Sequence, residues 1–370
     1  MDLTHRTAYR QEVLRKAQEA LAHPPRPITD YSAAMSEGGI HDYYSNGDYW
    51  WPNPDTADGL PYVRRDGESN PHNFKAHRDC VALLNAAVAD LASAWRMTGD
   101  NRYAQAAVRY LQMFFLDETT RMNPSLSYAQ AIPGVCTGRG IGIIDTIHLT
   151  DVPFAVRVLA DSPAMDAETR RGLTKWFADY LGWMCTHPYG VAERRERNNH
   201  GVGWFMQAAV FAAFTDDRDM CAFCRRAYKE DLLPRQMAPD GSFPLELART
   251  KPYNYSIFVL ELMTALCQVL STPQDNLWEF TLSDGRGIRR GMEFLYPYLK
   301  DKSAWPYAAD VQHFDGYPVR ISMLLFAADG LRDEKYATLW ESLPASSPDR
   351  EVRRNCIVRR PELWADDGKE

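Results

Sequence analysis

The sequence predicts an all-α fold, in which helical hairpins form the incomplete barrel of an α/α toroid. Three observations predict it. Apolar residues recur at helical spacing, as at Leu84, Val88, Leu91 and Trp95, which step by four, three and four residues. Short acidic corners separate consecutive amphipathic stretches. No alternating strand pattern of convincing length occurs, and about ten to twelve helices paired in hairpins suit a toroid.

The predicted helices follow one another with short connections. The first spans residues 6–22 and ends at the prolines 24, 25 and 27. The second ends at Thr98-Gly99-Asp100, and its antiparallel partner runs from Asn101 to about Leu116. Similar corners at 215–219 and 331–337 each cap a new helix. Further helices are expected at 141–159, 166–185, 200–214, 218–233, 254–270, 286–299 and 317–329.

A long irregular segment precedes most of these helices. Residues 28–73 have no sustained periodicity but many Gly, Pro, Asp and aromatic residues. So long a loop is either disordered or functional, and the aromatic content argues against disorder. Its rings either stack on a ligand or close one end of the helical core. We expect a single domain at 28–345, after an N-terminal helix and proline-rich breaker at 1–27 and before a C-terminal tail at 346–370.

Composition excludes several classes of partner. The net charge of -7, without a block of Lys and Arg, argues against nucleic-acid and anionic-membrane surfaces. Seven cysteines, an odd number, do not form a disulfide framework, and Cys221-x-x-Cys224 lacks the second pair that zinc would need. No signal peptide and no stretch that spans a bilayer is evident. We therefore expect a cytoplasmic protein, or a periplasmic or secreted one if a leader precedes this sequence.

Two dense polar clusters flank a helical hairpin. The first, Arg197-Asn198-Asn199-His200-Gly201, opens an apolar helical run. The second runs from residue 240 to 250 as Asp-Gly-Ser-Phe-Pro-Leu-Glu-Leu-Ala-Arg-Thr, and Tyr253-Asn254-Tyr255-Ser256 follows it. One capping residue is enough to start a helix, so an amide pair, an imidazole and an arginine together indicate an active site.

These motifs resemble the alginate lyase superfamily of helical-toroid polysaccharide lyases. The segment 43–54, Tyr-Tyr-Ser-Asn-Gly-Asp-Tyr-Trp-Trp-Pro-Asn-Pro, with Arg-Arg-Asp-Gly-Glu at 64–68, is similar to the branch that includes glucuronan lyases. The resemblance covers roughly residues 30–298 and implies the same toroid. It implies Asn199, His200, Arg249 and Tyr255 as the functional positions, and an acidic polysaccharide as the substrate.

A lyase of this kind removes the C5 proton of a 4-linked uronate and expels the oxygen at C4. It must neutralise the carboxylate, supply a base for C5 and supply an acid for the leaving oxygen. The Asn199 amide and the planar Arg249 guanidinium can neutralise the carboxylate. His200 can donate to the carboxylate or accept the C5 proton. Tyr255 can protonate the leaving oxygen; to act as the base its pKa of about 10 must fall, which a nearby Arg249 would achieve.

Stereochemistry leaves the base open. In β-linked glucuronate and mannuronate H5 and O4 lie on the same ring face, so Tyr255 alone can take and return the proton. In guluronate they lie on opposite faces, and His200 and Tyr255 would divide the work. The spacing from arginine to tyrosine is shorter than in longer alginate lyases, which leaves Tyr253 as a competitor for Tyr255. Predicted substrate-binding residues are Tyr44, Trp50, Trp51, Arg64, His77, Arg139 and Tyr253.

Each predicted catalytic residue also has a structural interpretation. Helix capping would explain Asn198 and Asn199, and a buried hydrogen bond would explain His200. Core packing would explain Tyr255, and an ion pair with Glu246 would explain Arg249.

Two other functions compete with the lyase. A glycoside hydrolase would use Asp240 and Glu246 as its carboxylate pair, and a non-catalytic binder would use Trp50 and Trp51. No cluster has metal-ligand spacing, so we expect neither metal nor cofactor. The sequence does not choose between glucuronan and polymannuronate, between endo and exo cleavage, or among oligomeric states.

Overall fold

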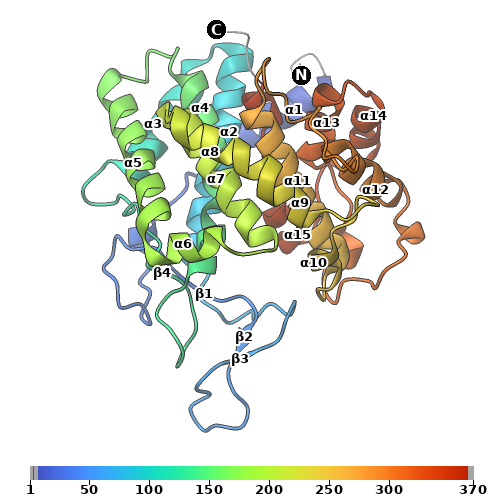
Figure 1. Ribbon diagram of the computed structural model, residues 1–370. Coiled ribbons are helices and arrows are strands. Elements are labelled where there is room, and N and C mark those ends of the chain that lie inside the picture. Colours follow the sequence, from blue (N-terminus) through green and yellow to red (C-terminus); the bar gives the residue numbers. More distant parts are fainter. Residues whose placement is uncertain (1–2, 4–6, 366–370) are drawn as a thin grey trace. The chain divides into compact units, whose positions relative to one another are not determined.

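The chain divides into two compact units. A computed structural model describes residue 3 and residues 7–365 (Figure 1). Unit 1 contains Met1–Arg64, Ser69–Ala192 and Val358–Glu370. Unit 2 contains Arg65–Glu68 and Glu193–Ile357. The first position of the predicted helix at 6–22 and the last five residues of the predicted tail lie outside the described residues.

Unit 1 is built around one long helix, α2 (Ala76–Thr98), which packs against α1, α3 and α4 (Figure 1). The side chains of Leu84, Val88 and Leu91 are fully buried, as their spacing predicted. Gly99 ends α2 at a φ of 69°, in the left-handed region that glycine tolerates. Asp100 then caps α3 by accepting the Arg102 N–H. The other helices of the unit are α1 (Thr7–Ala22), α3 (Asn101–Phe115), α4 (Asp151–Leu159), α5 (Ala167–Thr186) and the 3-10 helices η1 (Ile28–Asp30), η2 (Gly140–Leu149) and η6 (Pro361–Trp364).

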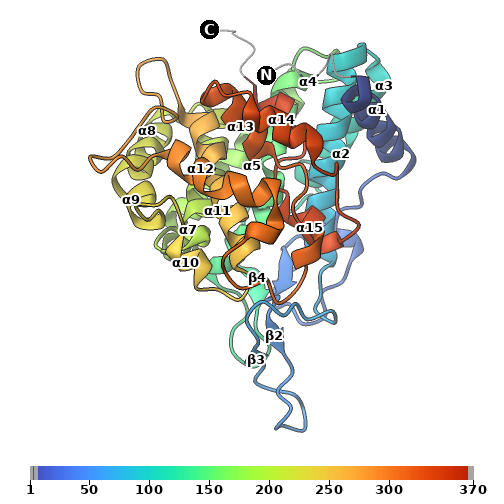
Figure 2. The same cartoon turned by 90° about the vertical axis from the view of Figure 1, so that its right-hand side faces the viewer.

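Short strands order the long irregular segment. Strand β1 (Tyr44–Asn46) pairs in parallel with β4 (Tyr128–Ala131), and β2 (Trp50–Trp51) pairs antiparallel with β3 (Val63–Arg64). The loop that joins β2 to β3 extends away from the helices of unit 1 in both views (Figures 1 and 2). Tyr43 and Tyr44 are buried, whereas Trp50 and Trp51 are half-buried. The segment therefore contributes rings to the core and leaves others partly accessible.

Unit 2 is centred on two apolar helices, α7 (Asn199–Thr215) and α11 (Pro252–Leu270), which pack against each other (Figure 1). Helix α11 also contacts α12 (Ile288–Lys300) and α13 (Ser322–Gly330), and α13 contacts α14 (Lys335–Ser342) (Figure 2). The remaining elements are α8 (Arg218–Ala227), η3 (Tyr228–Leu232), α9 (Leu233–Gln236), α10 (Pro244–Leu247), η4 (Lys302–Ala304), η5 (Phe314–Gly316) and α15 (Arg350–Asn355). Helix α6 (Pro188–Arg194) carries the chain from unit 1 into unit 2.

Two predicted helices are interrupted. The stretch 141–159 is a 3-10 helix followed by α4, because Gly142 lies so close to β4 that a Cβ there would be 2.5 Å from the Ala129 Cβ. Pro153 also lacks an N–H and so belongs in a first turn. The stretch 218–233 contains the π-helix η3, which precedes Pro234. Proline there removes a hydrogen bond and clashes with the preceding turn.

The expectation that no stretch is long enough to span a membrane is wrong for two helices. By length and composition alone, α2 and α11 would pass that test. Their most apolar windows are 67% and 78% buried within the protein. This burial is typical of the core helices of a folded protein.

The packing of Gly142 generates a stability prediction. Gly142→Ala should destabilise the protein by about 1–3 kcal/mol, since the new methyl group must displace Ala129 or its backbone. Gly182→Ala is the matched control, because Gly182 is exposed within α5 and a Cβ there meets nothing within 4 Å. We expect the control to gain about 0.5–1 kcal/mol from its lower backbone entropy. Urea unfolding measures both, and equal effects would contradict the close approach.

Candidate active site in unit 2

The start of α7 separates the roles of two adjacent asparagines. The Asn198 side chain caps the helix by accepting the His200 N–H at 3.0 Å. The Asn199 side chain is directed to Glu246 of α10: its Nδ2 donates to Oε2 at 2.7 Å, and its backbone N–H donates to Oε1 at 2.7 Å. Capping therefore accounts for Asn198 only.

Glu246 holds the Asn199 amide in one orientation. Its carboxylate is fully buried, and burial raises its pKa while the two Asn199 donors act to lower it. Since a carboxylate only accepts, the Asn199 Nδ2 must point toward it. The second Nδ2 hydrogen and the Oδ1 of Asn199 remain for other partners. Glu246 is thus an anchor for α7 and does not pair with Arg249.

His200 forms a pair with a buried acid at the end of α6. Its Nδ1 lies 2.8 Å from the Glu193 Oε1, and the Glu193 side chain is fully buried while that of His200 is 19% exposed. Burial acts to lower the pKa of His200, but the charge and hydrogen bond of Glu193, with the charge of Glu246, outweigh it and raise the pKa. The Glu193 contact occupies Nδ1, so a ligand would meet His200 through Nε2.

Arg249 joins an acid and a tyrosine. Its Nη2 and Nε donate to the two oxygens of Asp66 at 2.9 and 3.2 Å. The same Nη2 donates to the Tyr255 hydroxyl at 3.2 Å, and the guanidinium lies 4.3 Å from the centre of the Tyr255 ring. Thr250 donates to Asp66 as well, at 3.0 Å. The excursion Arg65–Glu68 therefore gives unit 2 the acid that holds Arg249 against Tyr255.

The two competing tyrosines have different environments. Tyr253 is fully buried among aromatic rings that include Trp305 and Phe314, and its hydroxyl donates to the Tyr298 carbonyl at 2.9 Å. Burial raises its pKa. A side chain in this position does not fit the substrate-binding role predicted for Tyr253. Tyr255 is half-buried and is the tyrosine beside Arg249.

Two of the predicted substrate-binding residues in unit 1, His77 and Tyr44, form hydrogen bonds within the protein. His77 is buried: its Nδ1 accepts the Tyr44 N–H at 3.0 Å and its Nε2 donates to the Tyr31 carbonyl at 2.9 Å. Burial lowers the pKa of His77, which keeps the ring neutral. The buried Tyr44 hydroxyl accepts from Asn46 at 2.9 Å. Their hydrogen bonds are internal, which does not fit the substrate-binding roles predicted for His77 and Tyr44.

The other predicted contacts remain accessible. Trp50, Trp51 and Arg139 are half-buried and Arg64 is exposed, with Trp50 paired to Arg64 in the β2–β3 ladder. The Arg139 guanidinium lies 5.7 Å from the centre of the Trp50 ring. These four residues stay predicted substrate contacts.

Sequence reasoning missed three acids of the site. From the sequence, Glu246 is only an ion-pair or hydrolase candidate, and Asp66 lies in a motif without a role of its own. For Glu193 the one sequence signal is its place seven residues before His200. Neither Cys221 nor Cys224 forms a disulfide within the described residues. Among residue 3 and residues 7–365, no three His, Cys, Asp or Glu side chains gather as a metal site would require.

Comparison with known proteins identifies the family. The alginate lyase family model matches residues 28–305. The chain belongs to the alginate lyase family. An alginate lyase from Bacteroides ovatus is 34% identical with a TM-score of 0.84, covering 94% of this chain and 92% of that one. The predicted enzyme class, a polysaccharide lyase, is confirmed. No curated protein matches the chain.

More distant alginate lyases share the fold. Alginate lyase A1-III from Sphingomonas species A1 is 14% identical with a TM-score of 0.54, and 86% of each chain is covered. A histidine-to-alanine variant of A1-III, complexed with a tetrasaccharide, is 14% identical with a TM-score of 0.57, covering 85% of this chain and 84% of that one. The predicted α/α toroid is thus confirmed for this alginate lyase family member.

The Glu193 contact predicts the titration of His200. Glu193→Gln should lower the pKa of His200, because it removes the charge that favours the imidazolium. A folded-state pKa above the unfolded value stabilises the protein fully at low pH, and this stability disappears as the pH rises through the folded pKa. The variant should therefore lose stability mainly on the acidic side.

Proton NMR of the imidazole signals measures the shift. His187 is the internal reference, because burial alone lowers its pKa and it belongs to unit 1. A His200 midpoint that stays in place in Glu193→Gln would show that the carboxylate does not control it.

Proposed function

We propose that the protein cleaves a 4-linked polyuronate, glucuronan or the polymannuronate of alginate, by metal-independent β-elimination that leaves an unsaturated uronate end. One observation carries the proposal: the Arg249 guanidinium contacts the Tyr255 hydroxyl at 3.2 Å. A positive charge at this distance stabilises the negative charge that forms on the phenolic oxygen when it loses a proton. Tyr255 is the base for the C5 proton and then the acid for O4, as same-face geometry allows.

The neighbouring residues would neutralise the substrate carboxylate. Asn199 offers its second Nδ2 hydrogen, which Glu246 leaves available by fixing the amide. His200, whose raised pKa favours the imidazolium, offers Nε2–H. Arg249 adds a permanent positive charge. Such donors stabilise the enolate-like intermediate, which carries more negative charge than the bound substrate.

The substrate class is supported by relatives. A histidine-to-alanine and a tyrosine-to-phenylalanine variant of alginate lyase A1-III were each crystallised with a tetrasaccharide. We transfer the class of an acidic oligosaccharide or polysaccharide ligand to this chain, and we lean to glucuronan because of the aromatic segment 43–54.

The contacts of Glu246 and Asp240 argue against the hydrolase alternative. Both oxygens of Glu246 accept from Asn199. Asp240 accepts the Ser242 N–H in its own turn at 2.9 Å, and hydrogen bonds from the side chain and backbone of Ser242 lower its pKa. An inverting or retaining hydrolase needs one acid that stays protonated and one available carboxylate at the bond. The described contacts of Glu246 and Asp240 give no support to that arrangement.

Tyr255→Phe tests the proposed base. We expect kcat to fall by about 10²- to 10⁴-fold, the usual contribution of a general acid–base group. Tyr253→Phe is the matched control: it removes a buried hydroxyl at a cost of about 1 kcal/mol in stability and should leave kcat within a few-fold. The measurement is the ultraviolet absorbance of the unsaturated uronate. Glucuronan, polymannuronate and polyguluronate serve in turn as the substrate, with a chelator present.

The products decide between the functions. New reducing ends without a double bond would show that the protein is a hydrolase and not a lyase. Binding of a uronan without any product would indicate a non-catalytic binding protein. Full activity in Tyr255→Phe would show that Tyr255 is neither the base nor the acid.

The pH profile of kcat/KM separates the two roles of His200. If the imidazolium donates to the carboxylate, activity falls as the pH rises through the pKa of His200. Glu193→Gln lowers that pKa, so the alkaline fall should move to lower pH. Were neutral His200 the base, activity would rise through the same pKa, and the variant would extend activity to lower pH. The deciding result is which limb of the profile moves in the variant: the alkaline limb for a donating imidazolium, the acidic limb for a neutral base.

A further inference from the structure

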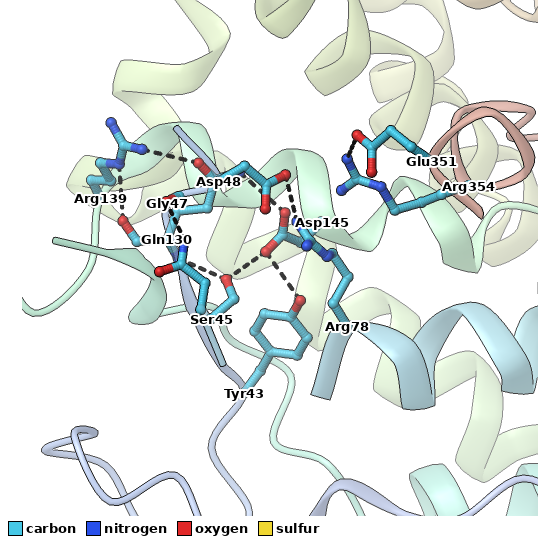
Figure 3. A network of polar contacts seen from close by, with 11 residues as sticks. Tyr43, Ser45, Gly47, Asp48, Arg78, Gln130, Arg139, Asp145, Glu351 and Arg354 are labelled. Carbon is cyan, nitrogen blue, oxygen red and sulfur yellow. Dashed lines mark hydrogen bonds and ion pairs between the residues drawn. The ribbon is translucent and has the colours of Figure 1, made fainter. Parts of the chain in front are cut away.

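A buried aspartate in unit 1 gathers donors from two strands. Asp145, in η2, is 3% exposed. Its Oδ2 accepts from the Tyr43 hydroxyl at 3.0 Å and from the Ser45 hydroxyl at 2.6 Å, and its Oδ1 accepts from Gln130 Nε2 at 3.1 Å (Figure 3). Burial and the charge of Asp145 raise the pKa of Tyr43, so this phenol stays a neutral donor. The carboxylate therefore joins β1 to β4 through Ser45 and Gln130, and also holds Tyr43, which precedes β1.

The network holds Gln130 in an unusual backbone conformation. Its φ is 49°, in the left-handed region that a residue with a side chain seldom occupies. The Gln130 N–H donates to the Ser45 hydroxyl oxygen at 2.8 Å while its side chain donates to Asp145. Surrounding hydrogen bonds of this kind are what maintain a strained residue.

Gln130 in turn determines where Arg139 lies. The Arg139 Nε donates to the Gln130 carbonyl at 2.9 Å, and its Nη2 donates to the Gln130 Oε1 at 3.1 Å. The guanidinium then lies near the Trp50 ring, and a Cβ at Gly47 would be 2.6 Å from Nη2 and 2.7 Å from Trp50 Cδ1. Glycine at position 47 is what lets the arginine and the tryptophan meet.

We propose that Asp145 is a positioning residue that, through Gln130, holds Arg139 beside Trp50 as a subsite for an acidic sugar. The half-buried indole offers a face for the ring C–H groups of the sugar, and the guanidinium offers charge for its carboxylate. Asp145 itself, buried beneath the strands, does not touch the sugar. This assignment rests on the proposed function, since only a uronate substrate needs both groups together.

The chain offers a matched control in the same unit. Asp151 is also fully buried, and it also accepts three donors: Asn85 Nδ2, the Arg359 N–H and Trp364 Nε1. None of these donors contacts Gln130, Arg139 or Trp50 in the described hydrogen bonds. Replacing either aspartate by asparagine puts an amide donor against existing donors, so both changes should destabilise the fold to a similar degree.

The test compares Asp145→Asn with Asp151→Asn on the uronan that the wild type cleaves. We expect Asp145→Asn to raise KM roughly tenfold with kcat within twofold, as for loss of one hydrogen bond to a charged group. Asp151→Asn should leave KM unchanged. In the Arg139→Ala background, Asp145→Asn should add no further rise in KM, because the residue through which it acts is gone. Should Asp145→Asn fail to fold, Ser45→Ala takes its place in the same cycle.

Three kinetic results would overturn the inference. Equal KM values for Asp145→Asn and the wild type, equal rises for both asparagine variants, or a full additional rise in the Arg139→Ala background would each make Asp145 merely structural. If the wild type releases no unsaturated product from any of the three uronans, the proposed function fails separately. The same variants are then compared by calorimetric binding of uronan oligosaccharides, where a loss confined to Asp145→Asn supports the subsite. A wild type that neither cleaves nor binds overturns both proposals.

Discussion

A carboxylate buried away from water must be matched by donors, and in unit 2 this constraint shapes the candidate active site. Removing an ionised acid from water costs several kcal/mol, which only charge-assisted hydrogen bonds offset. Glu246 meets the requirement with the backbone and side chain of Asn199, which ties α10 to the first turn of α7. One oxygen of Glu193, Oε1, meets it with the His200 imidazole. The residues that satisfy these acids are the ones whose motif resembles a lyase site.

The same rule applies to the charged residue of the site. Arg249 is held by both oxygens of Asp66, which comes from a four-residue excursion of the chain, Arg65–Glu68. A guanidinium held by both oxygens of an acid has little rotational freedom, so its contact with Tyr255 is well defined. Asp66 thereby fixes the orientation of the charge that we propose for the substrate carboxylate.

The sequence suggested candidate residues for the site but not the acids that hold them. Local signals identified the start of α7, the caps and the candidate set Asn199, His200, Arg249 and Tyr255, because motif and helix boundary coincide there. The sequence and the structure give Arg249 different partners. A spacing of three residues suggested Glu246, whereas the structure pairs Arg249 with Asp66, 183 residues away along the chain. Such a partner cannot be found from helical spacing.

The sequence by itself determined the long helices α2, α3, α5, α7 and α11, the capped starts of α3 and α7, and the family, because apolar periodicity, capping residues and motifs are local properties. Tertiary structure alone decided which polar groups are used internally. The sequence suggested His77 and Tyr44 as ligand contacts, yet each accepts a hydrogen bond from another buried group of the protein. Tyr253 and Tyr255 differ in the direction in which α11 turns their side chains. Burial depends on what packs against a residue from distant segments, and no local pattern records that.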